Sequence, residues 1–168
     1  IKPEHYMPAF DRGMAEQKKE VEVITSNPEP LTFANTVEAL ERSGALLNKV
    51  AGVFNNMTSS NTNEELQKID KELAPKLAQH GDDIAMNAAL FARVKAVYDQ
   101  KDRLALSTEE ARLLDETYKD FVRGGAGLPP DKQARLRQVN EELSVLAVQF
   151  GENVLKENNV FELVIDNE

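Results

Sequence analysis

Apolar residues recur three and four positions apart along almost the whole of this 168-residue chain. This spacing places them on one side of an α-helix, whereas a strand with one buried face requires strict alternation. No run of strict alternation occurs before the last ten residues. The pattern therefore predicts an all-α fold, a multi-helix bundle of about six helices.

Capping residues and helix breakers divide this pattern into separate helices. Six helices are predicted: from Pro3 or Tyr6 to about Ile24, from Thr36 to about Met57, around Leu66–Leu77, around Leu90–Tyr98, from Ser107 to Gly124, and from Pro130 to about Lys156. The third and fourth are expected to be separated by a break at Gly81 and Asp82.

Three helix ends have specific cap predictions. Asn35 is expected to be the N-cap of the second helix, with Glu38 three residues later as its capping-box partner. Ser107 and Glu110 form the same pattern at the start of the fifth helix. Gly124 is predicted to end that helix as a left-handed C-cap.

The last helix is followed by a change of character. Its apolar positions keep the spacing of one buried stripe: Leu136, Val139, Leu143, Leu146, Ala147, Phe150 and Val154. The segment Val160–Ile165 is then β-branched, aromatic and too short for another helix, so it predicts a β-like strand without its partner. We therefore expect residues 1–159 to form one helical amino-terminal domain, and residues 160–168 to be the truncated start of a following region.

The composition excludes several classes of protein. With 20 Lys and Arg against 29 Asp and Glu, the net charge of -9 repels phosphate backbones and anionic lipid surfaces, so neither nucleic acid nor a membrane is an expected partner. The chain contains no cysteine, which rules out disulfides, thiolate nucleophiles and cysteine metal sites within it.

Residues that could carry chemistry are few. The two histidines, His5 and His80, lack the spacing of a helical metal pair, and His80 is expected to be structural at the end of the third helix. Acidic pairs could suggest two-carboxylate catalysis or a cation site, but neighbouring helical residues point about 100° apart. We interpret these pairs as solvated faces: Glu64-Glu65, Asp82-Asp83, Glu109-Glu110, Asp115-Glu116 and Glu141-Glu142.

A glycine-rich segment, Arg123–Gly127, could be a phosphate cradle, but no strand precedes it and no Gly-Lys-Ser/Thr follows. We interpret it as a helix cap and a hinge. No serine lies in a Gly-x-Ser-x-Gly turn. The sequence thus predicts no catalytic, cofactor-binding or metal-binding residue in this chain.

Short segments along the whole chain resemble the amino-terminal helical region of the thimet oligopeptidase family of zinc metallopeptidases, and its peptidyl-dipeptidase (dipeptidyl carboxypeptidase) branch above all. Their order and spacing carry the resemblance. The segments are Pro3-Glu4-His5-Tyr6, Pro8-Ala9-Phe10, Thr32-Phe33, Asn35-Thr36, Ala39-Leu40-Glu41, Ser43-Gly44, Val53-Phe54, Thr58-Ser59, Ala74-Pro75, Leu90-Phe91, Arg112-Leu113-Leu114, Phe121-Val122-Arg123, Gly125-Ala126, Phe150 and Asn153-Val154.

The resemblance implies that this chain is the noncatalytic front portion of such an enzyme. In the family, a His-Glu-x-x-His motif with a later Glu binds zinc, and the metal-bound water attacks a peptide carbonyl. No position here matches that motif, so zinc is expected in the parent enzyme and no cofactor in this chain. The implied partners are the C-terminal catalytic domain of the same polypeptide and oligopeptide substrates, with these helices forming one wall of the substrate channel.

Two alternatives remain at this stage. One is an oligopeptidase of the same family that cuts peptides internally. The other is a stand-alone acidic helical module for protein interactions, which would need no active site either. The first twenty residues contain no apolar run of signal-peptide length, and we expect a cytoplasmic location, with the periplasm as the alternative.

Overall fold

The computed structural model describes residues 1–163, and this part of the chain is helical with no strand. The helices are α1 (Tyr6–Ser26), α2 (Ala39–Glu41), α3 (Ala45–Ser60), α4 (Glu64–Ala85), α5 (Ala88–Tyr98), α6 (Thr108–Arg123) and α7 (Pro130–Val160). Short 3-10 turns cover Pro3–His5 and Lys101–Arg103, and a π-helical turn, Ala34–Glu38, leads into α2. The predicted all-α bundle of about six helices is confirmed.

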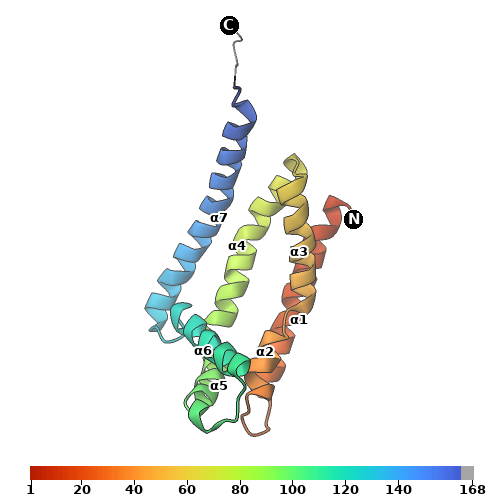
Figure 1. The fold of residues 1–168 in the computed structure, drawn as a ribbon. Helices are drawn as coiled ribbons and strands as arrows, with labels where there is room; N and C mark the ends of the chain where they lie inside the picture. The colour runs from red at the N-terminus through yellow and green to blue at the C-terminus, as the bar shows by residue number, and fades with distance from the viewer. Residues whose placement is uncertain (164–168) are drawn as a thin grey trace.

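The helices form an elongated molecule (Figure 1). Helices α1, α3 and α4 lie side by side, α5 and α6 cross one end of them, and α7 runs back along α4 and extends past the other helices. With 31 residues, α7 is about 46 Å long at the usual rise of an α-helix. No helix among residues 1–163 is long and apolar enough to cross a membrane.

Three apolar clusters form the core, and each joins helices distant in sequence. In the first, the ring of Phe54 on α3 meets Tyr6 and Phe10 of α1 edge to face, with ring centroids 5.0 and 5.5 Å apart. The second joins α1 to α5 and α6 through Ile24, Val94 and their neighbours. These contacts bury the apolar side of α1 that the sequence pattern predicted.

The cap at the start of the second predicted helix differs from the prediction. Asn35 is not the N-cap: the backbone N–H of Asn35 donates to the Thr32 hydroxyl, and the Thr32 N–H donates to Asn35 Oδ1, both at 3.0 Å. The capping pair therefore lies three residues earlier than expected, and Glu38 instead pairs with Arg42. Thr32 is the first residue after Pro30 whose side chain has an oxygen that can accept a hydrogen bond from the first turn.

The predicted helix from Thr36 to Met57 is broken at Gly44. Its φ of 74° is left-handed, and a Cβ there would lie 2.5 Å from Gln17 Nε2. The Gly44 N–H donates to Glu20 Oε2 at 2.7 Å. Contact with α1 thus stabilises a break that only glycine accommodates without strain.

The predicted break at Gly81 and Asp82 was also wrong, whereas the predicted end of α6 at Gly124 is confirmed except for the conformation of that glycine. Helix α4 passes through Gly81 and Asp82 without a break and ends at Ala85, after which Asn87 caps α5 by accepting a hydrogen bond from the Leu90 N–H. Gly124 is right-handed, with φ −71°, and the left-handed residue is Gly125, with φ 89°. The Ser107–Glu110 capping box is confirmed, with both reciprocal hydrogen bonds present.

The strand predicted for Val160–Ile165 is not supported. Val160 is the last residue of α7, and positions 161–163 have no regular secondary structure. Val164 and Ile165 lie outside the described residues. The helix continues to Val160 because no proline or glycine interrupts the chain after Gly151, and β-branched residues lower helix propensity only slightly.

Candidate functional site

The two histidines lie in different environments. His5 is exposed in the first turn, where its Nδ1 accepts a hydrogen bond from the Lys2 N–H at 3.2 Å. His80 is 5% exposed in the interior of α4, not at a helix end. Its Nε2 donates to Gln17 Oε1 at 2.7 Å, and its Nδ1 has no partner among the described residues. Burial lowers the pKa of His80, Lys18 lowers it further, and Asp83 opposes them.

Asp82 and Asp83 connect three helices. Asn140 of α7 donates to Asp82 Oδ1 at 2.6 Å. Lys18 of α1 and Arg137 of α7 both bind the Asp83 carboxylate at 2.8 Å. Burial alone would raise the pKa of Asp83, but the two cations outweigh it and hold the pKa below its usual value. These carboxylates therefore join helices: both oxygens of Asp83 and one oxygen of Asp82 bind protein donors.

A second acidic contact lies further along the same two helices. Glu152 of α7 pairs with Lys71 of α4 at 2.8 Å, and its other carboxylate oxygen has no partner within the described part of the chain. Burial, and then the charge of Glu152, raise the pKa of Asp70. Nowhere in residues 1–163 do three or more His, Asp or Glu side chains gather closely enough to bind a metal ion.

The glycine-rich segment is a helix terminator. The N–H groups of Gly124, Gly125, Ala126 and Leu128 all donate to carbonyls within the segment or in α6. Gln133 of α7 donates to the Gly125 carbonyl at 3.0 Å. Since a phosphate cradle needs several free N–H groups converging on the anion, the interpretation of this segment as a helix cap is consistent with its hydrogen bonds.

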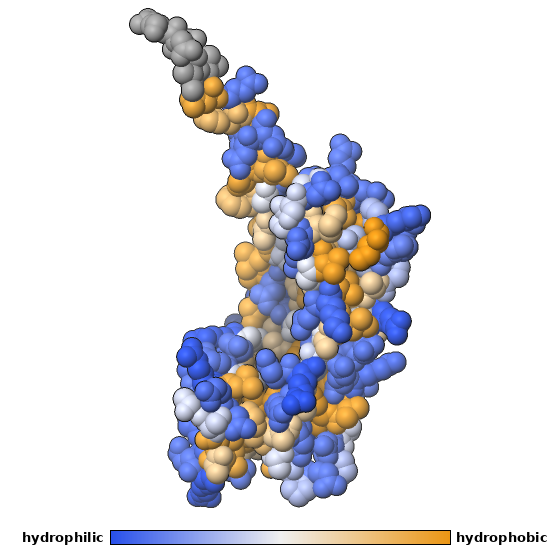
Figure 2. Space-filling view, turned by 45° about the vertical axis from the view of Figure 1, so that its right-hand side comes forward, coloured by the Kyte–Doolittle hydropathy of each residue, from blue (hydrophilic) through white to orange (hydrophobic). Residues whose placement is uncertain are grey.

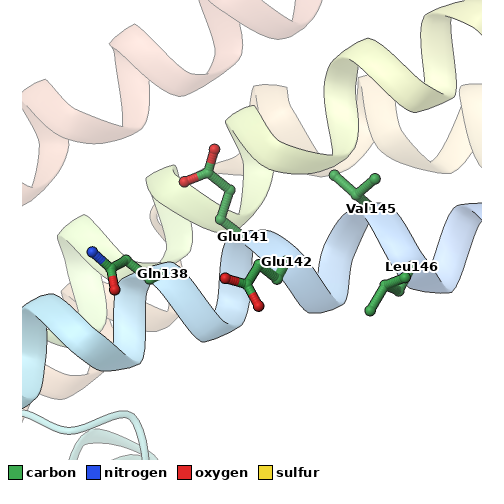
Figure 3. Close-up of a pocket in the computed structure, with 5 residues that line it drawn as sticks. All are labelled: Gln138, Glu141, Glu142, Val145 and Leu146. Atoms are coloured by element: carbon green, nitrogen blue, oxygen red, sulfur yellow. The ribbon is translucent and has the colours of Figure 1, made fainter.

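Two surface hollows differ in how they are lined. One, of about 440 Å³, lies among α1, α3, α4 and α6, with Leu47, Leu77 and Phe121 among its lining residues. The other, of about 590 Å³, is lined by residues of α7 alone. Figure 3 shows that Glu141 extends toward α4 and that Leu146 lies on the other side of α7. The second hollow is therefore an open helix surface.

The most unusual surface in the described structure is on α7. The predicted apolar stripe is present, but it is not buried: Leu143 is 56% exposed, Leu146 57% and Phe150 71%. Val154, 43% exposed, continues it along the helix, and Val139 at its start is half-buried. These five residues are called the α7 stripe below. Figure 2 shows apolar residues along the helix that leads to the grey segment.

The sequence pattern predicted the stripe but assigned it the wrong environment. Helix α7 contacts α4 through its opposite side, which carries Arg137, Asn140 and Glu152. This side also carries the half-buried Val148 and Leu155, but its polar residues made its apolar pattern weaker than that of the stripe. Asp83 and Lys71 of α4 pair with Arg137 and Glu152 of α7, but charged residues on a helix are also typical of solvated faces, so the sequence carried no signal for these pairs.

Comparison with known proteins shows close relatives of much greater length. The chain is 42% identical to dipeptidyl carboxypeptidase of Salmonella typhimurium over 167 residues, which are 99% of this chain and 25% of that protein. It is 40% identical to dipeptidyl carboxypeptidase of Escherichia coli over 163 residues, 97% of this chain and 24% of that protein. Oligopeptidase A of Salmonella typhimurium is 26% identical over 155 residues, 92% of this chain and 23% of that protein.

The chain thus spans about a quarter of the length of the curated relatives that it matches. No protein-family model matches it. The resemblance that the short segments indicated is nonetheless confirmed by these relatives, which align with 92–99% of the chain.

Proposed function

We propose a function from one premise, that this chain is a homologue of part of the dipeptidyl carboxypeptidases of the thimet oligopeptidase family. The proposal is that the chain is the noncatalytic amino-terminal portion of a zinc metallopeptidase that removes dipeptides from the carboxyl end of short peptides. We propose residues 1–159 as its helical region, a limit one residue before the end of α7 at Val160, and residues 160–168 as the start of the region that follows.

One observation carries the proposal: the match to dipeptidyl carboxypeptidases covers 97–99% of this chain and only 24–25% of each relative. The chain contains no His-Glu-x-x-His motif. In such an enzyme, zinc would supply an activated water from a site built by residues outside this chain. The residues described here would position and support that site.

The helical framework suits the role of a channel wall. Helices α1, α4 and α7 are joined through the carboxylates of Asp82 and Asp83, so they form a stiff layer with fixed spacing. A narrow channel bounded by such a layer admits flexible oligopeptides and excludes folded proteins. Its contribution is steric selection of substrate.

An internally cleaving oligopeptidase is the second candidate function, because oligopeptidase A of Salmonella typhimurium also matches 92% of the chain. The identity of 26% is lower than the 42% to the dipeptidyl carboxypeptidase of the same organism. This difference favours removal of carboxyl-terminal dipeptides. We further propose a cytoplasmic location, with the periplasm as the alternative.

The test is a product analysis with the full-length protein. It is incubated with an N-acetylated octapeptide, and products are followed by mass spectrometry from the earliest time points. We expect dipeptides to be released one after another from the carboxyl end, and the same peptide with an amidated carboxyl end to be a poor substrate. The amidated peptide is the matched control, because it differs only at the group that an exopeptidase must recognise.

Two other outcomes of this experiment would contradict the proposal. Cleavage inside the octapeptide before any dipeptide appears would replace the proposal with the internally cleaving candidate. Absence of any cleavage by a zinc-loaded, folded protein would overturn both.

A further inference from the structure

Helix α7 is fixed against rotation about its own axis. Near its start, Arg137 binds Asp83 and Asn140 binds Asp82, at 2.8 and 2.6 Å. Twelve residues further on, Glu152 binds Lys71 at 2.8 Å. Turning α7 to bury a different side would break all of these contacts and leave partly buried charges unpaired, which is costly.

The α7 stripe is therefore held on the outside. Leu143, Leu146, Phe150 and Val154 are 43–71% exposed, and they follow one another at helical spacing over three turns. Figure 3 shows Leu146 on the side of the helix away from Glu141 and α4. Single exposed apolar residues are ordinary, but a continuous apolar surface of this kind marks a place where another surface binds.

The comparisons indicate what covers it. This chain matches the relatives over nearly its whole length, yet three quarters of each relative lies outside the match. A second copy of the chain is a poorer occupant, because each copy has a net charge of -9 and would repel the other. In a protein of the relatives' length, the rest of the polypeptide is tethered to this portion, so its effective concentration at the stripe is high.

We propose that the α7 stripe is the docking surface for an apolar face of the remaining three quarters of the same polypeptide. This inference rests on one part of the proposed function, that this chain is a portion of a longer polypeptide. Helix α7 would then be the shared element of the two parts, with its polar side bound to α4 and its apolar side bound to the rest of the enzyme.

The experiment measures thiol protection in the full-length protein. Because residues 1–168 contain no cysteine, single substitutions place a thiol at chosen positions of this portion. Leu146→Cys and Phe150→Cys report on the stripe. Val23→Cys on α1 is the matched control, because Val23 is 69% exposed and Phe150 is 71% exposed. Alkylation by a maleimide is followed by peptide-resolved mass spectrometry and compared with the same variant in guanidinium chloride.

We expect the thiols at positions 146 and 150 to react at least tenfold more slowly in the native protein than in denaturant, and the thiol at position 23 to react within threefold of its denatured rate. Equal reactivity of all three thiols in the native protein would overturn the proposal. Protection at 146 and 150 that disappears on dilution would also overturn it, because it would assign the stripe to a second copy.

Peptidase activity is measured on the same samples, so the two proposals fail separately. An active peptidase with reactive stripe thiols would reject the docking surface and retain the proposed function. A folded, inactive protein with protected stripe thiols would reject the proposed function and retain an intramolecular docking surface.

Discussion

His80 shows how the tertiary environment decides the chemistry of a residue. Only its Nε2 has a hydrogen-bond partner, Gln17 Oε1, while Nδ1 is buried without one. A proton on Nδ1 would create a buried cation with an unsatisfied donor. Burial, and then Lys18, lower the pKa of His80, and Asp83 opposes this only in part. The neutral imidazole is therefore the form that suits the fold.

This environment predicts a pH dependence of stability. In the unfolded chain His80 binds a proton near pH 6.5, whereas in the folded protein it does so only at lower pH. Between these two values the unfolded state binds more protons, so the free energy of unfolding falls as pH decreases, by up to about 1.4 kcal/mol per pH unit. His80→Gln keeps a donor for Gln17 and should remove this dependence. Urea unfolding followed by circular dichroism between pH 7.5 and pH 5 measures it.

The control for this measurement is His5→Gln, which changes an exposed histidine at the start of the chain. It should retain the wild-type dependence. If His80→Gln also loses stability below pH 6.5 as steeply as the wild type, the environment described for His80 is wrong.

At the scale of elements, the approach of α1 to α3 depends on one glycine. A Cβ at Gly13 would lie 2.9 Å from the Cα of Leu47, closer than side chains tolerate. The two helices can therefore pack this closely only while position 13 lacks a side chain. Leu47, Phe10 and Phe54 form the apolar cluster at this contact, so a shift of the helices would loosen it.

We expect Gly13→Ala to lower the free energy of unfolding by about 2 kcal/mol, the usual cost of overpacking. Gly81→Ala is the matched control, because Gly81 lies inside α4 with no atom near its added Cβ. It should raise stability by about 0.5–1 kcal/mol through helix propensity. Urea unfolding compares the two variants, and a Gly13→Ala protein as stable as Gly81→Ala would refute the close approach.

Patterns of neighbouring residues predicted which segments are helical better than they predicted where each helix ends. The capping box at Ser107 and Glu110 was correct because it involves only neighbouring residues. Glycine was ambiguous: Gly44 ends a helix because it contacts Gln17 and Glu20 on α1, while Gly81 has no such contact and remains helical. Those contacts span more than twenty residues, so no local pattern contains them.

The α7 stripe likewise has one property that the sequence predicted and one that it could not predict. Helical spacing predicted the α7 stripe residue by residue, including Leu143, Leu146 and Phe150. The spacing could not predict that the stripe faces away from α4, because α7 packs through the ion pairs of Arg137 and Glu152. Burial depends on which helix is the partner, and that is a property of the assembled fold.

At the scale of the whole molecule, three features belong together. The described residues form an elongated layer of helices (Figure 1), they have no cluster of metal ligands, and their relatives are about four times as long. A stiff layer of this kind suits the supporting role that we propose for this portion. The central claim is that zinc is bound outside this portion.

The zinc content of the full-length protein tests this claim most directly. The variant His5→Gln/His80→Gln removes both histidines of this portion, and protein zinc sites that activate water use histidine ligands. We predict one zinc per chain by elemental mass spectrometry in both the wild type and the variant. Absence of zinc from the wild type, or its loss from a variant that unfolds at the wild-type temperature, would contradict the account.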